Sequence, residues 1–276
     1  MTSTTEALVR AALEEDAAFH DITTMATVPA ALQARATLRA RHAGVVAGVD
    51  CVRATFQLLD PACVVEVVAP DGTVVVAGGM VAVVSGPARA VLSGERTALN
   101  FIQRLSGIAT MTSRFVEAVR GTRARILDTR KTTPGWRAIE KAAVRAGGGT
   151  NHRMDLASAV LIKDNHLRAV GGDVARAVAL VRAALPLGAE IEVEADDIEQ
   201  VKAALAAGAE RILLDNMSLD TMRACVALTA GRARLEASGG VNLTTVRAIA
   251  ETGVDDISVG ALTHSAPALD LGLDFD

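Results

Sequence analysis

Residues 128–166 concentrate the side chains of this chain that could bind an anion. Seven cations stand there against four carboxylates, although the whole chain is acidic, with 28 Lys and Arg against 32 Asp and Glu. The cations are Arg130, Lys131, Arg137, Lys141, Arg145, Arg153 and Lys163, with His152 and His166 among them. Arg binds carboxylates and phosphates through its planar fork, and Lys binds them as a point charge. The window predicts a site for a ligand with more than one anionic group.

Six short apolar runs recur between residues 125 and 260, separated by Ala-rich stretches with helical spacing. They are RILD (125–128), VLIK (160–163), IEVE (191–194), RILLD (211–215), LEAS (235–238) and ISVG (257–260). Such runs are typical of a buried parallel sheet with helical crossovers. The last strands recur about every 22 residues, which is close to the lower limit for a β-α unit, so we expect a compact (β/α) barrel.

The polar residues that end these runs are candidate catalytic groups. The carboxyl ends of parallel barrel strands lie at one mouth, where Lys163, Glu194 and Asp215 are expected to meet. Three ionisable groups behind apolar strands need partners to offset their desolvation, which favours a functional role. Asp128 ends its strand in the same way, but we interpret it as a water-facing strand end or a structural hydrogen bond.

Two glycine-containing loops follow the last two strands. Ser238, Gly239 and Gly240 precede a helix capped by Asn242 or Thr244, and a second set of residues, Val259, Gly260 and Ala261, ends the final run. Glycines let the backbone approach a phosphate, whose charge is met by free N–H groups at helix N-termini. Ordinary tight turns are the alternative, but paired loops at this end of a barrel favour phosphate binding.

Other residues of the chain receive structural interpretations. Arg137, Lys141 and Arg145 are spaced by four on a helix, which predicts a solvated face. Trp136 is expected to pack, and Gly147–Gly149 to form a flexible loop that delivers His152 and Arg153. Histidines at metal-ligand spacing are missing, and His264 is the one outside the window that we place at the same mouth.

The first hundred residues predict a mixed sheet with helices. We expect helices over 5–13 and 49–59 and strands over 34–41 and 81–85. Pro70, Asp71 and Gly72 predict a hairpin between 64–69 and 73–76. From Ala88 the pattern is helical and predicts two helices that meet near Gly107.

Composition narrows the functional classes. The most apolar run, residues 74–84, contains two glycines and is far shorter than the roughly 20 residues that span a bilayer. The N-terminus has acidic residues where an export signal needs an apolar segment. Three cysteines without CxxC spacing indicate buried thiols in a reducing cytoplasm. The net charge of −4 and the scarcity of aromatic residues argue against nucleic-acid binding.

Several motifs together resemble one family. They are ERTALNFIQRLSGIAT (95–110), TRKTTPG (129–135), GGGTNHR (147–153), LIKDNH (161–166), EVE (192–194), LLDN (213–216), EASGG (236–240) and VGALTHS (259–265). In order and spacing they are similar to those of the quinolinate phosphoribosyltransferases, the carboxylating nicotinate-nucleotide pyrophosphorylases of NAD synthesis. The likeness spans nearly the whole chain.

The resemblance implies an α/β fold of two domains. Residues 1–107 and 266–276 would form an N-terminal α/β sandwich, and 108–265 an open (β/α) barrel that carries catalysis. It further implies a cytoplasmic homodimer, with higher oligomers left open, whose sites are completed by Arg104 of the other subunit.

The implied reaction is quinolinate plus phosphoribosyl pyrophosphate giving nicotinate mononucleotide, pyrophosphate and carbon dioxide. Mg²⁺ would be held mainly by the pyrophosphate, with Glu194 and Asp215 as candidates for direct contact. The implied substrate contacts fall into two groups. Arg104, Arg130, His152 and Arg153 would hold the carboxylates, and Lys131, Lys163, Ser238, Gly239, Gly240 and Gly260 the phosphates. Thr129, Val259, Ala261 and His264 complete the predicted wall of the substrate site.

The chemistry agrees with the residues. Loss of pyrophosphate leaves an oxocarbenium-like centre, which Glu194 and Asp215 are suited to stabilise. Three alternatives stay open: a phosphoribosyltransferase for an acid with one carboxylate such as nicotinate, a Schiff-base lyase using Lys163, and a non-catalytic nucleotide-binding regulator.

Overall fold

The computed structural model describes residues 3–185 and 189–276, which form two compact units. The first unit contains the chain up to Ser113 together with 132–148 and 262–276, and the second contains 114–131 and 149–261. The predicted domain boundaries lie a few residues from these divisions. The prediction did not include the transfer of 132–148 to the first unit.

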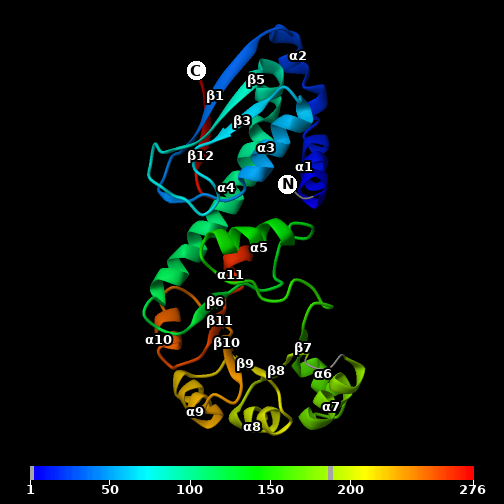
Figure 1. Ribbon diagram of the computed structural model, residues 1–276, viewed down its shortest axis with the longest axis vertical. Coiled ribbons are helices and arrows are strands. Elements are labelled where there is room, and N and C mark those ends of the chain that lie inside the picture. Colours follow the sequence, from blue (N-terminus) through cyan, green and yellow to red (C-terminus); the bar gives the residue numbers. More distant parts are fainter. Residues whose placement is uncertain (1–2, 186–188) are drawn as a thin grey trace. The chain divides into compact units, whose positions relative to one another are not determined.

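The first unit is built on a four-stranded antiparallel sheet in the order β12-β1-β5-β3 (Figure 1). The strands are β1 (Gln33–Ala40), β3 (Val64–Val67), β5 (Met80–Pro87) and β12 (Leu271–Phe275). Helices α1 (Ser3–Glu15) and α3 (Val49–Leu59) pack on each other, and α3 packs on β3. A short 3-10 helix (Ala18–His20) and α2 (Ile22–Thr27) precede β1. The predicted helices over 5–13 and 49–59 and the predicted strands over 34–41 and 81–85 are confirmed. Apolar residues of β1, α3, β5 and β12 form the core of the unit together with part of α4 (Ala88–Ala118).

The predicted hairpin around Pro70-Asp71-Gly72 is wrong. Strand β3 pairs with β5, whereas β4 (Val74–Val75) pairs with β2 (Gly44–Val45). The turn residue Gly72 instead donates its N–H to Val46. A local turn signal marks where the chain reverses, but it does not determine which strand becomes the partner.

The two helices expected to meet near Gly107 are one continuous helix, α4 (Ala88–Ala118). A Cβ at Gly107 would lie 2.1 Å from the carbonyl oxygen of Pro267. Glycine is therefore required there for close packing against the C-terminal segment, and it does not break the helix.

Helix α5 (Arg137–Ala146) belongs to the first unit and corrects a second expectation. The side chain of Lys141 is fully buried, so the predicted solvated face holds for exposed Arg145 but not for Lys141. Trp136 stacks on Phe101 with ring centroids 4.7 Å apart, as its packing interpretation predicted. Gly147 closes the helix, where a Cβ would lie 2.3 Å from the carbonyl oxygen of Ala109.

The second unit is a six-stranded parallel sheet in the order β6-β11-β10-β9-β8-β7. All six predicted strands are confirmed: β6 (Arg125–Leu127), β7 (Val160–Ile162), β8 (Ile191–Ala195), β9 (Arg211–Asp215), β10 (Arg234–Ser238) and β11 (Asp256–Ser258). The first and last members of the order, β6 and β7, are edge strands, so the barrel is open.

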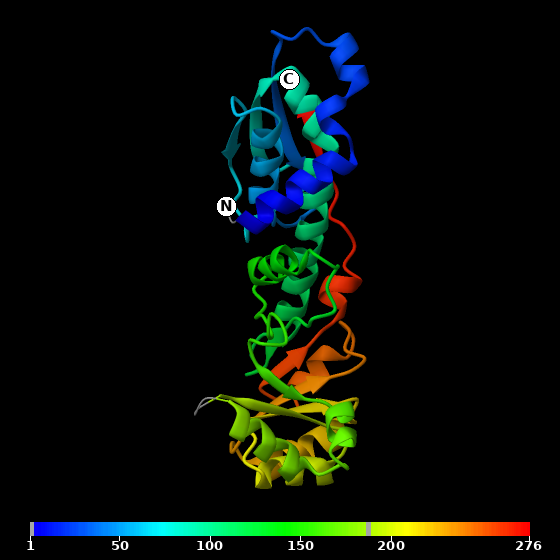
Figure 2. The same ribbon diagram turned by 90° about the vertical axis from the view of Figure 1, so that its right-hand side faces the viewer.

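Helices follow the strands of the second unit and lie side by side along the sheet (Figure 2). They are α6 (Asp164–Ala169), α7 (Val174–Ala184), α8 (Ile198–Ala206), α9 (Leu219–Thr229) and α10 (Val246–Ala250), and α11 (Ala261–His264) follows β11. The side chains of Asp173, Asp197 and Ser218 accept hydrogen bonds from the first turns of α7, α8 and α9. These caps fix where each helix begins.

Two predictions from composition can be checked directly. Cys51, Cys63 and Cys225 are free and buried, as expected. Among the described residues, none of the helices combines the length and the hydrophobicity of a membrane span.

Candidate active site

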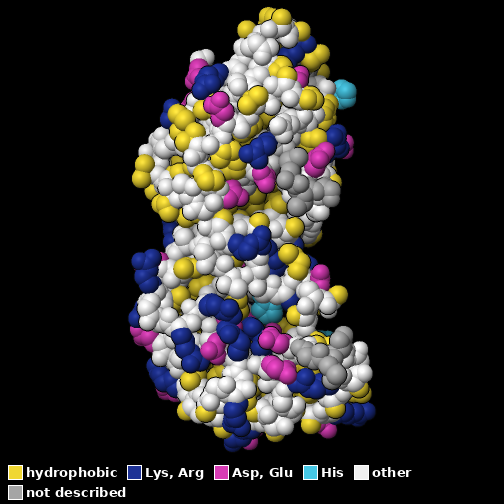
Figure 3. Space-filling view, viewed as in Figure 1, with side chains coloured by type: hydrophobic (Ala, Val, Ile, Leu, Met, Phe, Trp, Pro, Cys, Tyr) yellow, Lys and Arg dark blue, Asp and Glu magenta, His cyan; other side chains and the backbone are white. Residues whose placement is uncertain are grey.

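A cavity of about 500 Å³ lies at the carboxyl ends of the strands of the second unit. In Figure 3, Lys and Arg side chains gather beside Asp, Glu and a His on this part of the surface. Most of the predicted site residues line the cavity: Thr129, Arg130, Lys131, His152, Arg153, Lys163, Glu194, Asp215, Ser238, Gly239 and Gly240. Residues more than a hundred positions apart in the sequence therefore meet around one space, as the parallel sheet requires.

Lys163 and Glu194 form an ion pair inside this cavity. The Lys163 Nζ lies 2.5 Å from Glu194 Oε2, and the Glu194 carboxylate is largely buried. Asp215 stands on the neighbouring strand, where burial and then the charge of Glu194 raise its pKa. The Asn216 side chain donates a hydrogen bond of 2.8 Å to Asp215 and opposes this rise. The cavity thus combines cations with two crowded carboxylates.

Ser238, Gly239 and Gly240 supply a backbone wall to the cavity. Gly239 and Gly240 adopt φ values of 97° and 60°, a region that favours glycine. A Cβ at Gly239 would lie 2.1 Å from Asn216 Oδ1. Glycine is needed here for both reasons.

The cap after these glycines corrects one detail of the phosphate prediction. The N–H groups of Thr244 and Thr245 donate to Asn242 Oδ1 at 2.9 and 3.2 Å. They are therefore engaged within the turn that precedes α10, whose N-cap is Thr245 instead of Asn242 or Thr244. The Ser238–Gly240 backbone is the part of this loop that lines the cavity.

Asp128 holds the segment that carries His152 and Arg153. Its carboxylate is fully buried and accepts hydrogen bonds from the His152 N–H at 2.8 Å and from Asn151 Nδ2 at 2.5 Å. Of the two interpretations of Asp128, the structural hydrogen bond is confirmed. The loop after α5 is thereby tied to the end of β6.

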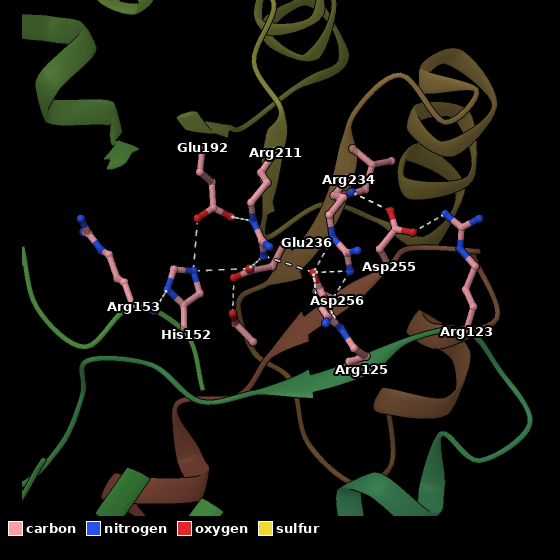
Figure 4. A network of polar contacts seen from close by, with 12 residues as sticks. Arg123, Arg125, His152, Arg153, Glu192, Arg211, Arg234, Glu236, Asp255 and Asp256 are labelled. Carbon is pink, nitrogen blue, oxygen red and sulfur yellow. Dashed lines mark hydrogen bonds and ion pairs between the residues drawn. The ribbon is translucent and has the colours of Figure 1, made fainter. Parts of the chain in front are cut away.

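His152 sits between two buried carboxylates (Figure 4). Its Nε2 lies 3.2 Å from Glu192 Oε2 and 3.4 Å from Glu236 Oε2. Burial lowers the His152 pKa, but the hydrogen bonds to Glu192 and Glu236 outweigh it and raise the pKa to about 9. Arg211 contacts both carboxylates, at 3.6 Å from Glu192 and 3.0 Å from Glu236.

Sequence reasoning did not identify Glu192, Glu236 and Arg211 as site residues. A signal existed, because side chains two apart on a strand share a face. Glu192 stands two before Glu194, and Glu236 two before Ser238. A charged residue that lies inside an apolar strand, two positions before a site residue, is expected to lie on the same face and to contact the side chains of the site from below.

Five predicted substrate-site residues do not line this cavity: Arg104, Val259, Gly260, Ala261 and His264. His264 belongs to the first unit, where its Nδ1 lies 2.6 Å from Ser265 Oγ. Arg104 also belongs to the first unit and contacts the carbonyls of Ala266 and Thr263 and the Glu140 carboxylate. Their assignments remain predictions.

Two groups of residues have ligand atoms suited to a metal ion. Within the described ranges, His152, Glu192 and Glu236 bring their ligand atoms within 4.8 Å of one another. Arg211 already neutralises these carboxylates, so the cluster is a poor cation site. Glu194 and Asp215 offer carboxylate oxygens, the donors that Mg²⁺ prefers, at the wall of the cavity of about 500 Å³, and Lys163 already pairs with Glu194.

Comparison with known proteins identifies the family. The profile for the quinolinate phosphoribosyl transferase C-terminal domain matches residues 108–274, and that for the N-terminal domain matches 21–106. The chain belongs to the quinolinate phosphoribosyltransferase family. A nicotinate-nucleotide pyrophosphorylase [carboxylating] from Mycobacterium leprae is 46% identical over 275 residues, covering 96% of this chain and 95% of that protein.

Other members of the quinolinate phosphoribosyltransferase family agree in sequence and in structure. A probable nicotinate-nucleotide pyrophosphorylase [carboxylating] from Bacillus subtilis is 45% identical, over 87% of this chain and 82% of its own length. The crystal structure of NadC from Streptococcus pyogenes superposes with a TM-score of 0.94 at 40% identity, covering 99% and 98% of the two chains. The α/β fold with a parallel C-terminal sheet is thus that of the family.

Proposed function

We propose that this chain is a quinolinate phosphoribosyltransferase, converting quinolinate and phosphoribosyl pyrophosphate into nicotinate mononucleotide, pyrophosphate and carbon dioxide. The observation that carries the proposal is the cavity of the second unit. Arg130, Lys131, Arg153 and Lys163 surround it together with Glu194 and Asp215. Several cations suit a dicarboxylate and a diphosphate, and the carboxylates suit a cationic transition state.

The residues divide into two halves with different tasks. Arg130 and Arg153, with His152 beside them, are proposed to hold the two carboxylates of quinolinate. Lys131, Lys163 and the Ser238–Gly240 backbone are proposed to hold the phosphates. Binding both substrates between these halves fixes the ring nitrogen next to C1 of the ribose, which replaces a bimolecular encounter by a positioned one.

The chemistry needs charge stabilisation more than a nucleophile. As the C1–O bond to pyrophosphate breaks, positive charge grows on the ribose, and Glu194 and Asp215 face it. The ring nitrogen then forms the bond to C1 and becomes quaternary. This positive nitrogen stabilises the electron pair left at the adjacent carbon when carbon dioxide departs, and a proton completes the product.

Mg²⁺ is proposed as a cofactor that arrives with phosphoribosyl pyrophosphate. Glu194 and Asp215 are the residues that would contact it, since both are carboxylates beside the proposed phosphate half. When bound, the ion would neutralise charge on the leaving pyrophosphate.

Lys163 is better suited to phosphate binding than to Schiff-base chemistry. Its ammonium lies 2.5 Å from a largely buried carboxylate. A lysine whose amino group is engaged in a close ion pair is poorly placed to attack a carbonyl group. Borohydride with a carbonyl substrate is therefore expected to leave Lys163 unmodified.

Product formation tests the proposed function. Purified chain is incubated with phosphoribosyl pyrophosphate, Mg²⁺ and either quinolinate or nicotinate, and nicotinate mononucleotide and carbon dioxide are measured. Turnover with quinolinate and equimolar carbon dioxide is expected. Turnover with nicotinate alone would favour the enzyme for an acid with one carboxylate, and binding without product would favour the regulator.

We also propose a cytoplasmic homodimer with shared sites, in which the other subunit supplies a cation from α4. Arg104 is 27% exposed and would have to give up its contacts to Ala266, Thr263 and Glu140. Arg96, eight residues earlier on the same helix, has an exposed side chain. The exposed Arg96 is therefore an additional candidate that the motifs did not single out.

Mixed dimers separate these candidates. Arg96→Ala and Arg104→Ala chains are each combined with Lys163→Ala chains, and activity is measured in verified heterodimers. If an arginine acts across the interface, the Lys163→Ala chain supplies it to the site that contains Lys163 of the arginine variant. This heterodimer then has one intact site, and activity is expected to return. Rescue by neither arginine variant would count against shared sites.

A further inference from the structure

The second layer beneath the cavity has an arrangement that substrate contact alone does not explain. Beside the active-site cavity of about 500 Å³ lies a smaller cavity of about 130 Å³, and His152 and Arg153 line both. Of the two carboxylates, Glu236 lines the active-site cavity and Glu192 lines the smaller one. His152 therefore lies in the wall between these two cavities.

The backbone N–H and both ring nitrogens of His152 contact groups of the same chain. Its N–H donates to Asp128, its Nδ1 lies 2.7 Å from the Arg153 N–H, and its Nε2 faces Glu192 and Glu236. The hydrogen bond that Nδ1 accepts favours the neutral ring with its single proton on Nε2. The two carboxylates favour the doubly protonated, cationic ring. Nε2 carries a proton in both forms and donates it to the carboxylates.

Side chains of the neighbouring strands contact both carboxylates. Glu192 and Glu236 are 3% and 1% exposed, so two adjacent charges at this depth would repel each other and lose hydration. Arg211 on β9, between β8 and β10, contacts both, and Ser258 on β11 donates to Glu236. These contacts link β8, β9, β10 and β11 through side chains.

We propose that Glu192, Glu236 and Arg211 are positioning residues for the carboxylate-binding half of the site. They fix the His152 ring in the wall between the two cavities. Through the Nδ1 contact to the Arg153 N–H, they also fix the backbone that carries the Arg153 guanidinium. The inference rests on the proposed function, because it assigns this half of the cavity to quinolinate.

The role differs from simple fold stability in its selectivity. Arg153 and Arg130 are on the proposed quinolinate side. On the phosphate side, Lys163 is held by Glu194, and the Ser238–Gly240 backbone is held by the Asn216 N–H, which donates to the Ser238 carbonyl, so neither is held through His152. Substituting Glu192 or Glu236, and so loosening His152, should therefore weaken the binding of quinolinate more than the binding of phosphoribosyl pyrophosphate. A residue that only stabilised the sheet would affect both substrates alike, or neither.

Steady-state kinetics of three variants tests this selectivity. Glu236→Gln and Glu192→Gln are expected to raise the KM for quinolinate about tenfold, the usual effect of loosening a residue that orients a ligand-binding group, and to change that for phosphoribosyl pyrophosphate less than twofold. Glu236→Met, which has no acceptor for His152, should be worse than Gln. The matched control is Asp255→Asn, at the amino end of the same sheet. It loses the ion pair with Arg123 at 2.7 Å, keeps an amide oxygen for the Leu235 N–H, and should change neither KM.

Nuclear magnetic resonance of labelled histidine supplies a readout that does not depend on turnover. The wild-type His152 signal, assigned with His152→Gln, should report a proton on Nε2 and titrate above the free value, and Glu236→Gln should lower its midpoint. Glu192 and Glu236 face Nε2 of the ring, and the Arg153 N–H faces Nδ1. Arg211 is charged and contacts both glutamates, and Asp128 is charged and binds the His152 backbone. If the Met variant does not fold, the Gln variants and this titration decide.

Equal increases in both KM values, or an unchanged quinolinate KM with an unchanged His152 signal, would overturn the proposal. A wild-type chain that does not turn over quinolinate would instead refute the proposed function. The histidine titration would still report whether the carboxylates orient the ring.

Discussion

The two ends of the six-stranded sheet both gather charges, but they use them differently. At the amino ends, Asp256 is fully buried and is surrounded by Arg125, Arg211 and Arg234 at 2.8 to 3.1 Å. At the carboxyl ends, Lys and Arg side chains line a cavity beside only partly buried Asp215, and Lys163 pairs with Glu194 there. The charges at the amino ends are buried and neutralised within the chain, whereas those at the carboxyl ends line a cavity that a ligand can enter.

Two aspartates show this contrast through their pKa values. Burial raises the pKa of Asp256, but Arg125, Arg211 and Arg234 outweigh it and lower the pKa overall. Burial and Glu194 raise the pKa of Asp215. The charge of Asp256 at the amino ends therefore stabilises the fold. The charge of Asp215 at the carboxyl ends costs stability, as is common for functional sites.

Lys163→Ala should have the largest effect. Removing an ammonium from the proposed phosphate half is expected to lower kcat/KM by about 10²–10³, as for other single groups that stabilise transition-state charge. Lys202→Ala is the control, because Lys202 is an exposed lysine paired with Glu199 on α8. A loss below tenfold in Lys163→Ala would contradict its assignment.

Asp256→Ala should act on stability instead of on the site. Removing this carboxylate leaves three arginines without their shared partner, and the free energy of unfolding should fall by about 3 kcal/mol. Denaturant unfolding measures it, with Asp220→Ala at an exposed pair as the control, expected to change by under about 0.5 kcal/mol. An Asp256 variant as stable as the control would refute the contrast between the two ends.

Gly239→Ala tests the backbone wall of the cavity. The positive φ and the contact with Asn216 should cost about 1–2 kcal/mol and displace the loop. The KM for phosphoribosyl pyrophosphate should rise roughly tenfold, in keeping with this energy. Gly231→Ala is the control, because Gly231 has a similar φ of 78° but open space around its Cβ position. Equal effects on the KM in both variants would exclude a specific role for the Gly239 loop.

Asp215→Asn should have the smallest effect on stability, and its sign is opposite to that of Asp256→Ala. A carboxyl whose pKa is raised by folding costs stability above that pKa, and the cost disappears as the pH falls below the ordinary value of 3.8. At pH 7 the variant should be more stable by a few tenths of a kcal/mol, since solvent screens this partly exposed group. A gain that persists at pH 3 would show another cause.

Much of the second unit could be predicted because its signals are local and periodic. Continuous Ile, Leu and Val runs identify buried parallel strands, and the residues after them must meet at one edge. This reasoning places Lys163, Glu194 and Asp215 at that edge from the sequence alone. Strand alternation also puts Glu192 on the face of Glu194, and Glu236 on that of Ser238, but their contacts with His152 and Arg211 depend on which strands are neighbours.

The errors in the first unit have the same origin. Pro70-Asp71-Gly72 marks a turn, but the strands on either side of it pair with other strands, β3 with β5 and β4 with β2. Gly107 resembles a helix break, yet it serves close packing against Pro267. Lys141 follows the spacing of an exposed face, although it is buried. In each case a tertiary contact overrides the local pattern.

A crystal structure with quinolinate bound tests the central claim most directly, because it shows which charges of the second unit meet the ligand. The two carboxylates are expected beside Arg130 and Arg153 in the cavity at the carboxyl ends of the strands. Quinolinate bound at the amino ends, or with its carboxylates turned away from both arginines, would contradict the account.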